Sequence, residues 1–197
     1  MEQYVITISR QFGSMGRSIA KELSTILGIE FMDRDIVEAT AKRMGLPVSV
    51  ISDEEESMKS NFFRRQYPLG MGLSSLKDEI FYTQKNIIRD FAAKGSCIIV
   101  GRCADYILED LPKHLNVYIY APDEARLKNC VENLQMDPQT AKKMMRDVDA
   151  ARNRYHKAYI PGWQNVFDHK DLMIDSSRFG IDGTAKILAD IVRNQWG

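Results

Sequence analysis

The chain has 197 residues, enough for one α/β domain or one domain with a subdomain, and its 44% hydrophobic and 27% charged residues are ordinary for a globular protein. Its 27 basic and 27 acidic residues cancel, so no global charge favours nucleic acid or a membrane surface as a partner. The three cysteines include no CxxC pair, which argues against a disulfide framework and a structural zinc site. The sequence has no signal-peptide pattern and no apolar run of about 18 residues, so we expect a cytoplasmic protein without a membrane span.

The most informative stretch is residues 5–23, VITISRQFGSMGRSIAKEL, in which a short apolar alternation, a glycine-bearing turn and a helical pattern follow one another. A phosphate-binding loop requires this order of strand, loop and helix, because the amides at a helix start bind anions. The pattern G-x-x-x-x-G-K-[ST] is matched at Gly16 and Ser18, but Gln11 replaces the first glycine and Arg17 the lysine. The stretch therefore predicts a variant phosphate-binding loop with Ser18 as a magnesium ligand; the alternative is an ordinary strand-to-helix turn.

A charged triplet, Asp33, Arg34 and Asp35, follows a short strand predicted over 29–32. One of its aspartates can cap the next helix, or the triplet can face a second ligand opposite the first loop.

Residues 47–77 then combine an acidic run with aromatic residues, arginines and glycines. We interpret this segment as an insertion that forms a lid or a partner surface.

A helix predicted over 77–94 leads to an apolar strand over 96–100, which indicates a parallel sheet with both faces covered. Gly101 and Arg102 come directly after this strand. Because open α/β sheets bind ligands at the carboxyl ends of their strands, Arg102 is a candidate anion contact. The alternative is a surface arginine that caps the carbonyls of the next turn.

The second half of the chain predicts further alternation of helices and strands. A short helix over 103–111, a strand over 116–120, helices starting near 123 and 138, a strand over 171–175 and a final helix follow one another. Five strand signals alternating with helices predict βαβ units and a parallel sheet.

Charged residues are dense on the long helix that starts near Pro138. Arg146, Asp149 and Arg152 are spaced by three residues and share one helix face. They form either a solvated face with ion pairs or an arginine lid that closes over transferring phosphates.

Several stretches together resemble the cytidylate kinase-like family, relatives of cytidylate kinase within the nucleoside monophosphate kinases: ITISRQFGSMGRSIA, FMDRDIV, IIVGRCADYIL, VYIYAP, RDVDAARNRYHKAY and DLMIDSS, in the family's order. The resemblance covers nearly the whole chain. It implies one P-loop kinase domain over 1–197, a three-layer α/β/α fold with a five-stranded parallel sheet, an acceptor-binding insertion at about 35–95 and a lid at about 137–165.

The same resemblance assigns roles to three groups of residues. It implies acceptor contacts by Asp33 and Arg102, to which we add Arg34. It implies the lid arginines Arg152 and Arg154, and we expect Arg17 and Asp149 to act with them as the catalytic group. It implies a donor-phosphate group of Gly13, Ser14, Met15, Gly16, Arg17 and Ser18.

These residues predict an ATP-dependent phosphotransferase that uses Mg²⁺ and transfers the γ-phosphoryl group to CMP, dCMP or a related small acceptor. Cys103 stands where cytidylate kinases have aspartate after Gly-Arg, so the acceptor stays open, and with a hydroxyl acceptor Asp33 becomes the candidate base. A nucleotide- or phosphate-binding protein without catalysis and an interaction protein that uses the 47–77 segment are the alternatives. We expect a small-molecule partner, no nucleic acid or membrane, and a monomer or homodimer.

Overall fold

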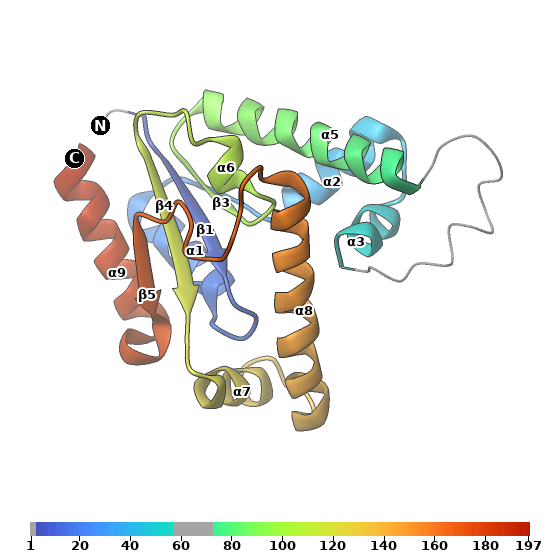
Figure 1. Ribbon diagram of the computed structural model, residues 1–197. Helices are drawn as coiled ribbons and strands as arrows, with labels where there is room; N and C mark the ends of the chain where they lie inside the picture. Colours follow the sequence, from blue (N-terminus) through green and yellow to red (C-terminus); the bar gives the residue numbers. More distant parts are fainter. Residues whose placement is uncertain (1–2, 57–72) are drawn as a thin grey trace.

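The computed structural model describes residues 3–56 and 73–197; the centre of the predicted 47–77 insertion lies outside the described residues. A parallel five-stranded sheet forms the middle of the molecule (Figure 1). Its strands lie in the order β2 (Glu30–Met32), β3 (Cys97–Val100), β1 (Val5–Arg10), β4 (His114–Tyr120) and β5 (Leu172–Asp175). This confirms the predicted parallel α/β fold.

The central strand β1 pairs with a neighbour on each side, Ile8 lying opposite Val100 of β3 and opposite Val117 of β4. Ile8, Val100 and Val117 are fully buried, as expected of parallel strands that are covered on both faces.

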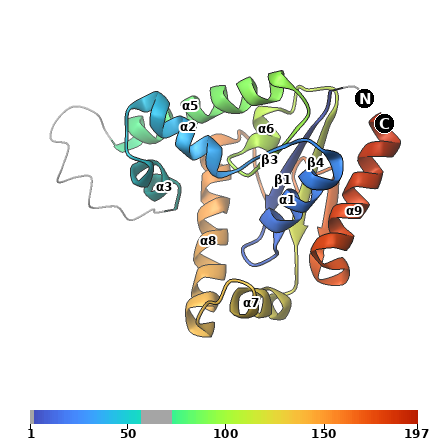
Figure 2. The ribbon, with the colours of Figure 1, turned by 180° about the vertical axis from the view of Figure 1, so that it is seen from behind.

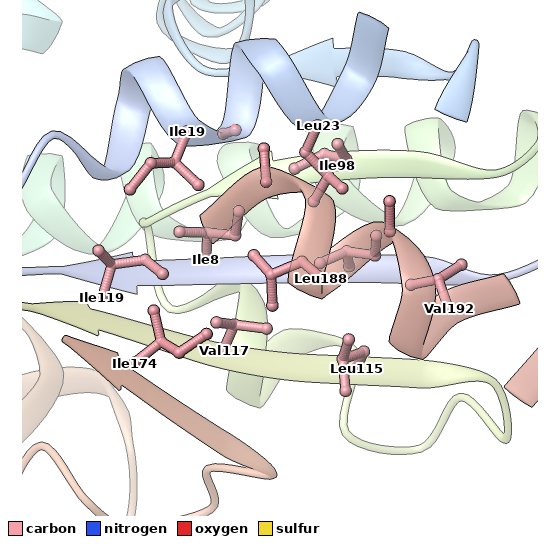
Figure 3. Packing of buried hydrophobic residues seen from close by; sticks show 14 of the residues in the cluster. Ile8, Ile19, Leu23, Ile98, Leu115, Val117, Ile119, Ile174, Leu188 and Val192 are labelled. Carbon is pink, nitrogen blue, oxygen red and sulfur yellow. The ribbon is translucent and has the colours of Figure 1, made fainter. Parts of the chain in front are cut away.

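Two long helices, α1 (Gly16–Leu27) and α9 (Ser176–Trp196), pack together on the face of the sheet seen in Figure 2. Their apolar sides meet the sheet in one continuous core, shown in Figure 3. Ile19 and Leu23 of α1 and Leu188 of α9 are fully buried there against Ile8 of β1. This core fixes where the first helix begins, and therefore where the loop before it lies.

The other face is covered by α5 (Leu73–Lys94), the single-turn α6 (Ala104–Ile107) and the long helix α8 (Pro138–Tyr159). The ring of Phe81 on α5 stacks on Tyr159 of α8 at a centroid distance of 4.1 Å. The helices α2 (Arg34–Met44) and α3 (Val48–Glu56) extend this side beyond the sheet, and α7 (Asp123–Glu132) lies beyond the carboxyl end of β4 (Figure 1). In the described part of the chain no helix is long and apolar enough to cross a membrane.

Local boundaries agree with the sequence at several capping residues. They differ at α6, at the start of β4 and at the start of α5, which is Leu73 rather than 77. Gly28 ends α1 with a left-handed φ of 65°, and Asp137 starts α8 by accepting a hydrogen bond from the Thr140 amide at 2.9 Å. The helix predicted over 103–111 is wrong in extent, because it is only one turn long. β4 begins at His114 rather than 116, since its pairing with β1 already starts at His114, opposite Val5.

Candidate functional site

The loop between β1 and α1 follows a compact path that two left-handed residues make possible. Gly13 has a φ of 78°, and a Cβ there would stand only 2.9 Å from the Arg126 carbonyl and from Cys130 Sγ. Met15, the second left-handed residue, precedes α1, which has no side-chain cap. The first amides of α1 therefore keep the donor capacity that binds an anion at a helix start.

Ser14, which was predicted to contact donor phosphates, has a buried side chain that supports the loop. Its hydroxyl donates to the carbonyl of Gln11 at 2.9 Å. The Ser176 hydroxyl in turn donates to the Ser14 carbonyl at 2.7 Å. The Ser14 amide donates to the same Gln11 carbonyl at 3.4 Å, so the hydroxyl, amide and carbonyl of Ser14 all take part in holding the loop.

Side chains from α7 and α8 hold the loop from the opposite side. Arg126 Nε donates to the Phe12 carbonyl at 2.7 Å, and Asn129 Nδ2 donates to the Gly13 carbonyl at 3.0 Å. Asp149 Oδ1 accepts the Phe12 amide at 2.7 Å, and its other oxygen pairs with Arg126 Nη2. The loop is thus fixed by a buried ion pair between two helices that come more than a hundred residues later in the chain.

Arg126 was missed by the sequence reasoning, although a local signal exists. It lies four residues before Cys130, and these are the buried residues of α7. A charged residue on the buried face of an amphipathic helix needs a partner, because burying an unpaired charge is costly.

Asp33 lies between two arginines that come from different sides of the site. Its Oδ2 is 2.6 Å from Nε of Arg17 at the start of α1, and its Oδ1 is 3.2 Å from Nη1 of Arg102 after β3. Asp33 is 6% exposed, and although it precedes α2 its side chain makes no capping hydrogen bond. The capping alternative therefore does not describe Asp33, whose carboxylate joins the predicted donor arginine to the predicted acceptor arginine.

Arg102 stands in a strained stretch of backbone. Gly101, Arg102 and Cys103 have φ values of 77°, 56° and 53°, a left-handed run that costs energy for the two residues with side chains. The Arg102 guanidinium donates to the Val100 carbonyl at 3.2 Å as well as to Asp33. This carbonyl belongs to β3, before Arg102, and not to the next turn named in the alternative, and the Arg102 side chain is only 12% exposed.

A cavity of about 800 Å³ lies over these groups. It brings together the β1 end, the start of α1, the β3 end and the side of α8. Its charged lining residues are Arg10, Arg17, Asp33, Arg34, Arg102, Asp147, Asp149, Arg152, His156 and Lys170.

The predicted site residues divide into two sets in space. The acceptor residues Asp33, Arg34 and Arg102 share the cavity with Arg17, Asp149 and Arg152. Arg154, by contrast, is exposed on α8 and is not among the cavity's lining residues. Residues 13–16 and Ser18 are not among the cavity's lining residues either, and Ser18 is half-buried in the first turn of α1.

Burial tunes two groups that face the cavity. It lowers the pKa of the Arg152 guanidinium against the opposing pull of Asp149, yet an arginine keeps its charge near neutral pH. Desolvation raises the pKa of Tyr118 to about 12, so its phenol stays protonated and can donate a hydrogen bond. Both groups can therefore stabilise an anion.

A second buried charge cluster lies beside the cavity. Lys170 pairs with Asp105 of α6, and both side chains are almost wholly buried. His156 Nδ1 bonds the Arg152 carbonyl at 2.9 Å, while its Nε2 lies 3.9 Å from Asp105 Oδ1, which has no hydrogen-bond partner. Because a carbonyl only accepts, Nδ1 carries the proton of the neutral ring, and the bare Nε2 faces an oxygen that cannot donate to it.

The described residues include no group of three or more His, Cys, Asp or Glu side chains that could hold a metal ion. Asp33 and Asp149 face the cavity, but arginines and a loop amide already bind their oxygens. Such a donor set suits a Mg²⁺ ion that is carried mainly by phosphate oxygens and water rather than by a cage of protein ligands.

The parallel sheet, the loop before α1 and the arginines gathered over the strand ends define a phosphotransferase of the P-loop kinase class. A model of the cytidylate kinase-like family matches residues 5–178, and the chain belongs to this family. It is therefore a kinase of the nucleoside monophosphate kinase type.

Individual relatives cover the chain almost completely. The cytidylate kinase of Methanocaldococcus jannaschii is 23% identical over 194 residues, which are 96% of this chain and 98% of that one. A crystal structure of an uncharacterized protein from Eubacterium ventriosum is 25% identical, covers 97% of this chain and 99% of its own, and superposes with a TM-score of 0.72.

Two shikimate kinases share the fold at lower identity. The Bacteroides thetaiotaomicron enzyme has a TM-score of 0.58 at 12% identity over 98% of this chain and 99% of its own. The Acinetobacter baumannii enzyme, solved with shikimate, has a TM-score of 0.52 at 15% identity over 99% of this chain and 96% of its own. These likenesses concern the architecture alone.

Proposed function

We propose that this kinase transfers the γ-phosphoryl group of ATP to CMP, dCMP or a related small acceptor. The observation that carries the proposal is the position of Asp33, which pairs with Arg17 and Arg102 in one cavity. A donor phosphate at Arg17 and an acceptor anion at Arg102 would then be neighbours, and phosphoryl transfer requires such proximity. The name of the Methanocaldococcus jannaschii relative supports cytidylate as the first acceptor to test.

The donor end of the reaction uses the loop and the start of α1. The amides of the first turn and the Arg17 guanidinium would bind the β- and γ-phosphates of ATP. A bound Mg²⁺ would neutralise charge on these phosphates, with Ser18 as its protein ligand.

The acceptor end uses the carboxyl end of β3 and the side of α8. Arg102 would bind the acceptor's anionic group, and Arg152 would neutralise the charge that develops on the transferred phosphoryl group. Arg152 is already fixed, since its Nη1 donates to the Arg10 carbonyl at 2.9 Å and lies 3.7 Å from Asp149 Oδ1. A phosphate acceptor needs no protein base, because its oxygen is already ionised.

A hydroxyl acceptor is the second candidate, and the buried carboxylate of Asp33 is the observation that favours it. Asp33 faces the same cavity and could accept the hydroxyl proton as the oxygen attacks phosphorus. The two candidates differ in their need for this carboxylate.

The test is an ATP-consumption assay with CMP, dCMP, UMP, AMP and small hydroxylated metabolites as acceptors, with the phosphorylated product identified by mass. We expect turnover with a cytidine monophosphate, and we expect Arg152→Ala to lower it on the order of 10³-fold while the melting temperature stays near that of the wild type. Arg17→Ala should weaken ATP binding. Exposed Arg43, which pairs with Asp90 on α5, supplies the matched control Arg43→Ala.

An inert protein whose melting temperature rises with ATP would point to a nucleotide-binding protein without transfer. No response of the melting temperature to ATP would contradict the donor site itself.

A further inference from the structure

The paths of the chain after β1 and β3 open a crevice between two neighbouring strands. The strands are joined up to their ends, where the Gly101 amide donates to the Ile8 carbonyl at 3.1 Å. Beyond this bond, the chain after β1 turns to α1 on one face of the sheet, and the chain after β3 turns to α6 on the other. In an open α/β sheet, ligands bind at the carboxyl end of strands where the connections diverge in this way.

Arg10, the last residue of β1, lies across this crevice. A Cβ added to Gly16 at the start of α1 would stand 2.7 Å from Arg10 Cβ, and one added to Gly101 would clash with Arg10 Nη1. The side chain therefore runs from the donor loop to the strand end that carries Arg102, and a glycine at each end leaves room for it.

The main chain of Arg10 is fixed as well. Its carbonyl accepts the hydrogen bond from Arg152 Nη1 at 2.9 Å, and its side chain lines the cavity together with Arg17, Arg102 and Arg152. Arg17 and Arg102 are held at Asp33, on the β2 side of the cavity. The Arg10 side chain, by contrast, extends from Gly16 at the donor loop to Gly101 at the end of the strand that carries Arg102.

We propose that Arg10 is a further catalytic residue, whose guanidinium contacts the phosphate group that lies between donor and acceptor. This inference rests on the proposed function. A bond forms between the acceptor oxygen and the γ-phosphorus, and the bond from that phosphorus to the β,γ-bridging oxygen breaks, so ADP leaves with the electron pair. Arg10 keeps its proton throughout and neutralises the charge on the equatorial oxygens.

The experiment compares the wild type with Arg10→Met, which keeps most of the side chain's length without charge, and Arg10→Lys, which keeps charge without the planar fork. With the best acceptor of the panel, Arg10→Met should lower kcat on the order of 10³-fold and leave both KM values within a few-fold. The kcat of Arg10→Lys should lie between those of Arg10→Met and the wild type. Arg10→Lys also serves as the second variant if Arg10→Met fails to fold. Arg43→Met is the control for loss of an arginine outside the cavity.

A kcat for Arg10→Met equal to that of the wild type would overturn the role of Arg10 and leave the proposed function standing. If the wild type phosphorylates no acceptor, the proposed function fails, and binding of adenosine linked to cytidine through five phosphates decides the role of Arg10. A loss of about tenfold in affinity in Arg10→Met, the effect of one charge-assisted hydrogen bond, then supports the contact. Equal affinities, or no binding of the analogue by the wild type, overturn it.

Discussion

Asp33 shows how one carboxylate can organise two arginine side chains that come from different elements. It is buried between Arg17 and Arg102, and a bidentate or bridging carboxylate holds guanidinium groups in a defined orientation. The same carboxylate also competes with any phosphate for those arginines. Removal of the carboxylate should therefore raise the affinity for anions but lower turnover.

We predict that Asp33→Asn binds inorganic pyrophosphate about tenfold more tightly than the wild type, because both arginines lose their competing charge. Turnover should fall, since Arg17 and Arg102 are no longer oriented. Calorimetric titration measures the first effect and the ATP-consumption assay the second. Asp147→Asn removes an exposed carboxylate from the same cavity and is the matched control. Tighter binding in both variants would mean that only net charge matters.

Single residues were predictable from the sequence where a local pattern carries the chemistry. Gly101-Arg102 follows an apolar strand, and Arg17 follows the loop glycine, so the local pattern alone places both at strand or helix ends. Arg10 and Arg126 were not predicted as site residues, because what fixes them lies far along the chain. Arg126 and its acceptor Phe12 are 114 residues apart, and no local periodicity encodes such a pair.

At the scale of elements, α7 and α8 act as a clamp on the loop before α1. Arg126 is the centre of the clamp, since it bonds the Phe12 carbonyl and pairs with Asp149 and Asp123. Its side chain is 6% exposed, so its charge has little access to water once these partners are lost. The clamp therefore stabilises both the fold and the shape of the loop.

We predict that Arg126→Met lowers the free energy of unfolding by about 3 kcal/mol, since it leaves the partly buried Asp149 without its main partner. It should also weaken ATP binding, because the Phe12 carbonyl loses its donor. Denaturant titration and calorimetry measure the two effects. Arg89→Met breaks an exposed pair with Asp110 and should change the free energy of unfolding little, because solvent screens such pairs. Equal losses in both variants would contradict a special role for the clamp.

The elements themselves were predicted best where burial is continuous. β1, β3 and β4 appear in the sequence as apolar runs because helices cover both faces of the sheet. The extent of α6 was predicted wrongly at its end, because the chain leaves helical geometry at Leu108, where no glycine or proline marks the change. The contacts of α8 with the loop before α1 could not be predicted either. A charged helix face has the same sequence pattern whether it meets solvent or a buried partner.

At the scale of the whole molecule, the buried pair of Asp105 with Lys170 and the neighbouring His156 ring join three separate parts of the chain: α6, the segment before β5, and α8. Burial lowers the pKa of His156, although the nearby Asp105 carboxylate opposes this shift and Lys170 and Arg10 reinforce it. The native state thus takes up a proton on His156 less readily than the unfolded chain does.

The lowered pKa of His156 makes the protein less stable at mildly acidic pH. Above pH 6.5, the ordinary pKa of histidine, neither state is protonated there and the contribution to stability is complete. As the pH falls below that value, the unfolded chain binds the proton first, so stability declines until the native pKa is passed. The lowered pKa of Asp105 adds a separate loss at more acidic pH, below its ordinary value of 3.8.

We predict that His156→Gln loses less stability than the wild type when the pH is lowered from about 7 to about 5. His114, whose pKa burial also lowers, contributes with the same sign in both proteins and cancels in the comparison. Denaturant titration at each pH gives the free energies. The control is His169→Gln, which alters an exposed ring and should follow the wild type. If the free energy of unfolding of His156→Gln falls with pH as steeply as that of the wild type, His156 does not contribute to the pH dependence.

The clamp on the loop also sets an order of events during synthesis. The loop leaves the ribosome among the first residues, but Asp149, which accepts the Phe12 amide, follows 137 residues later. Arg152, which bonds the Arg10 carbonyl, comes later still. At synthesis rates of about 5–20 residues per second, the nascent chain carries the complete loop sequence for several seconds before these partners arrive. The loop can therefore gain the contacts that fix its shape only when most of the chain has been made.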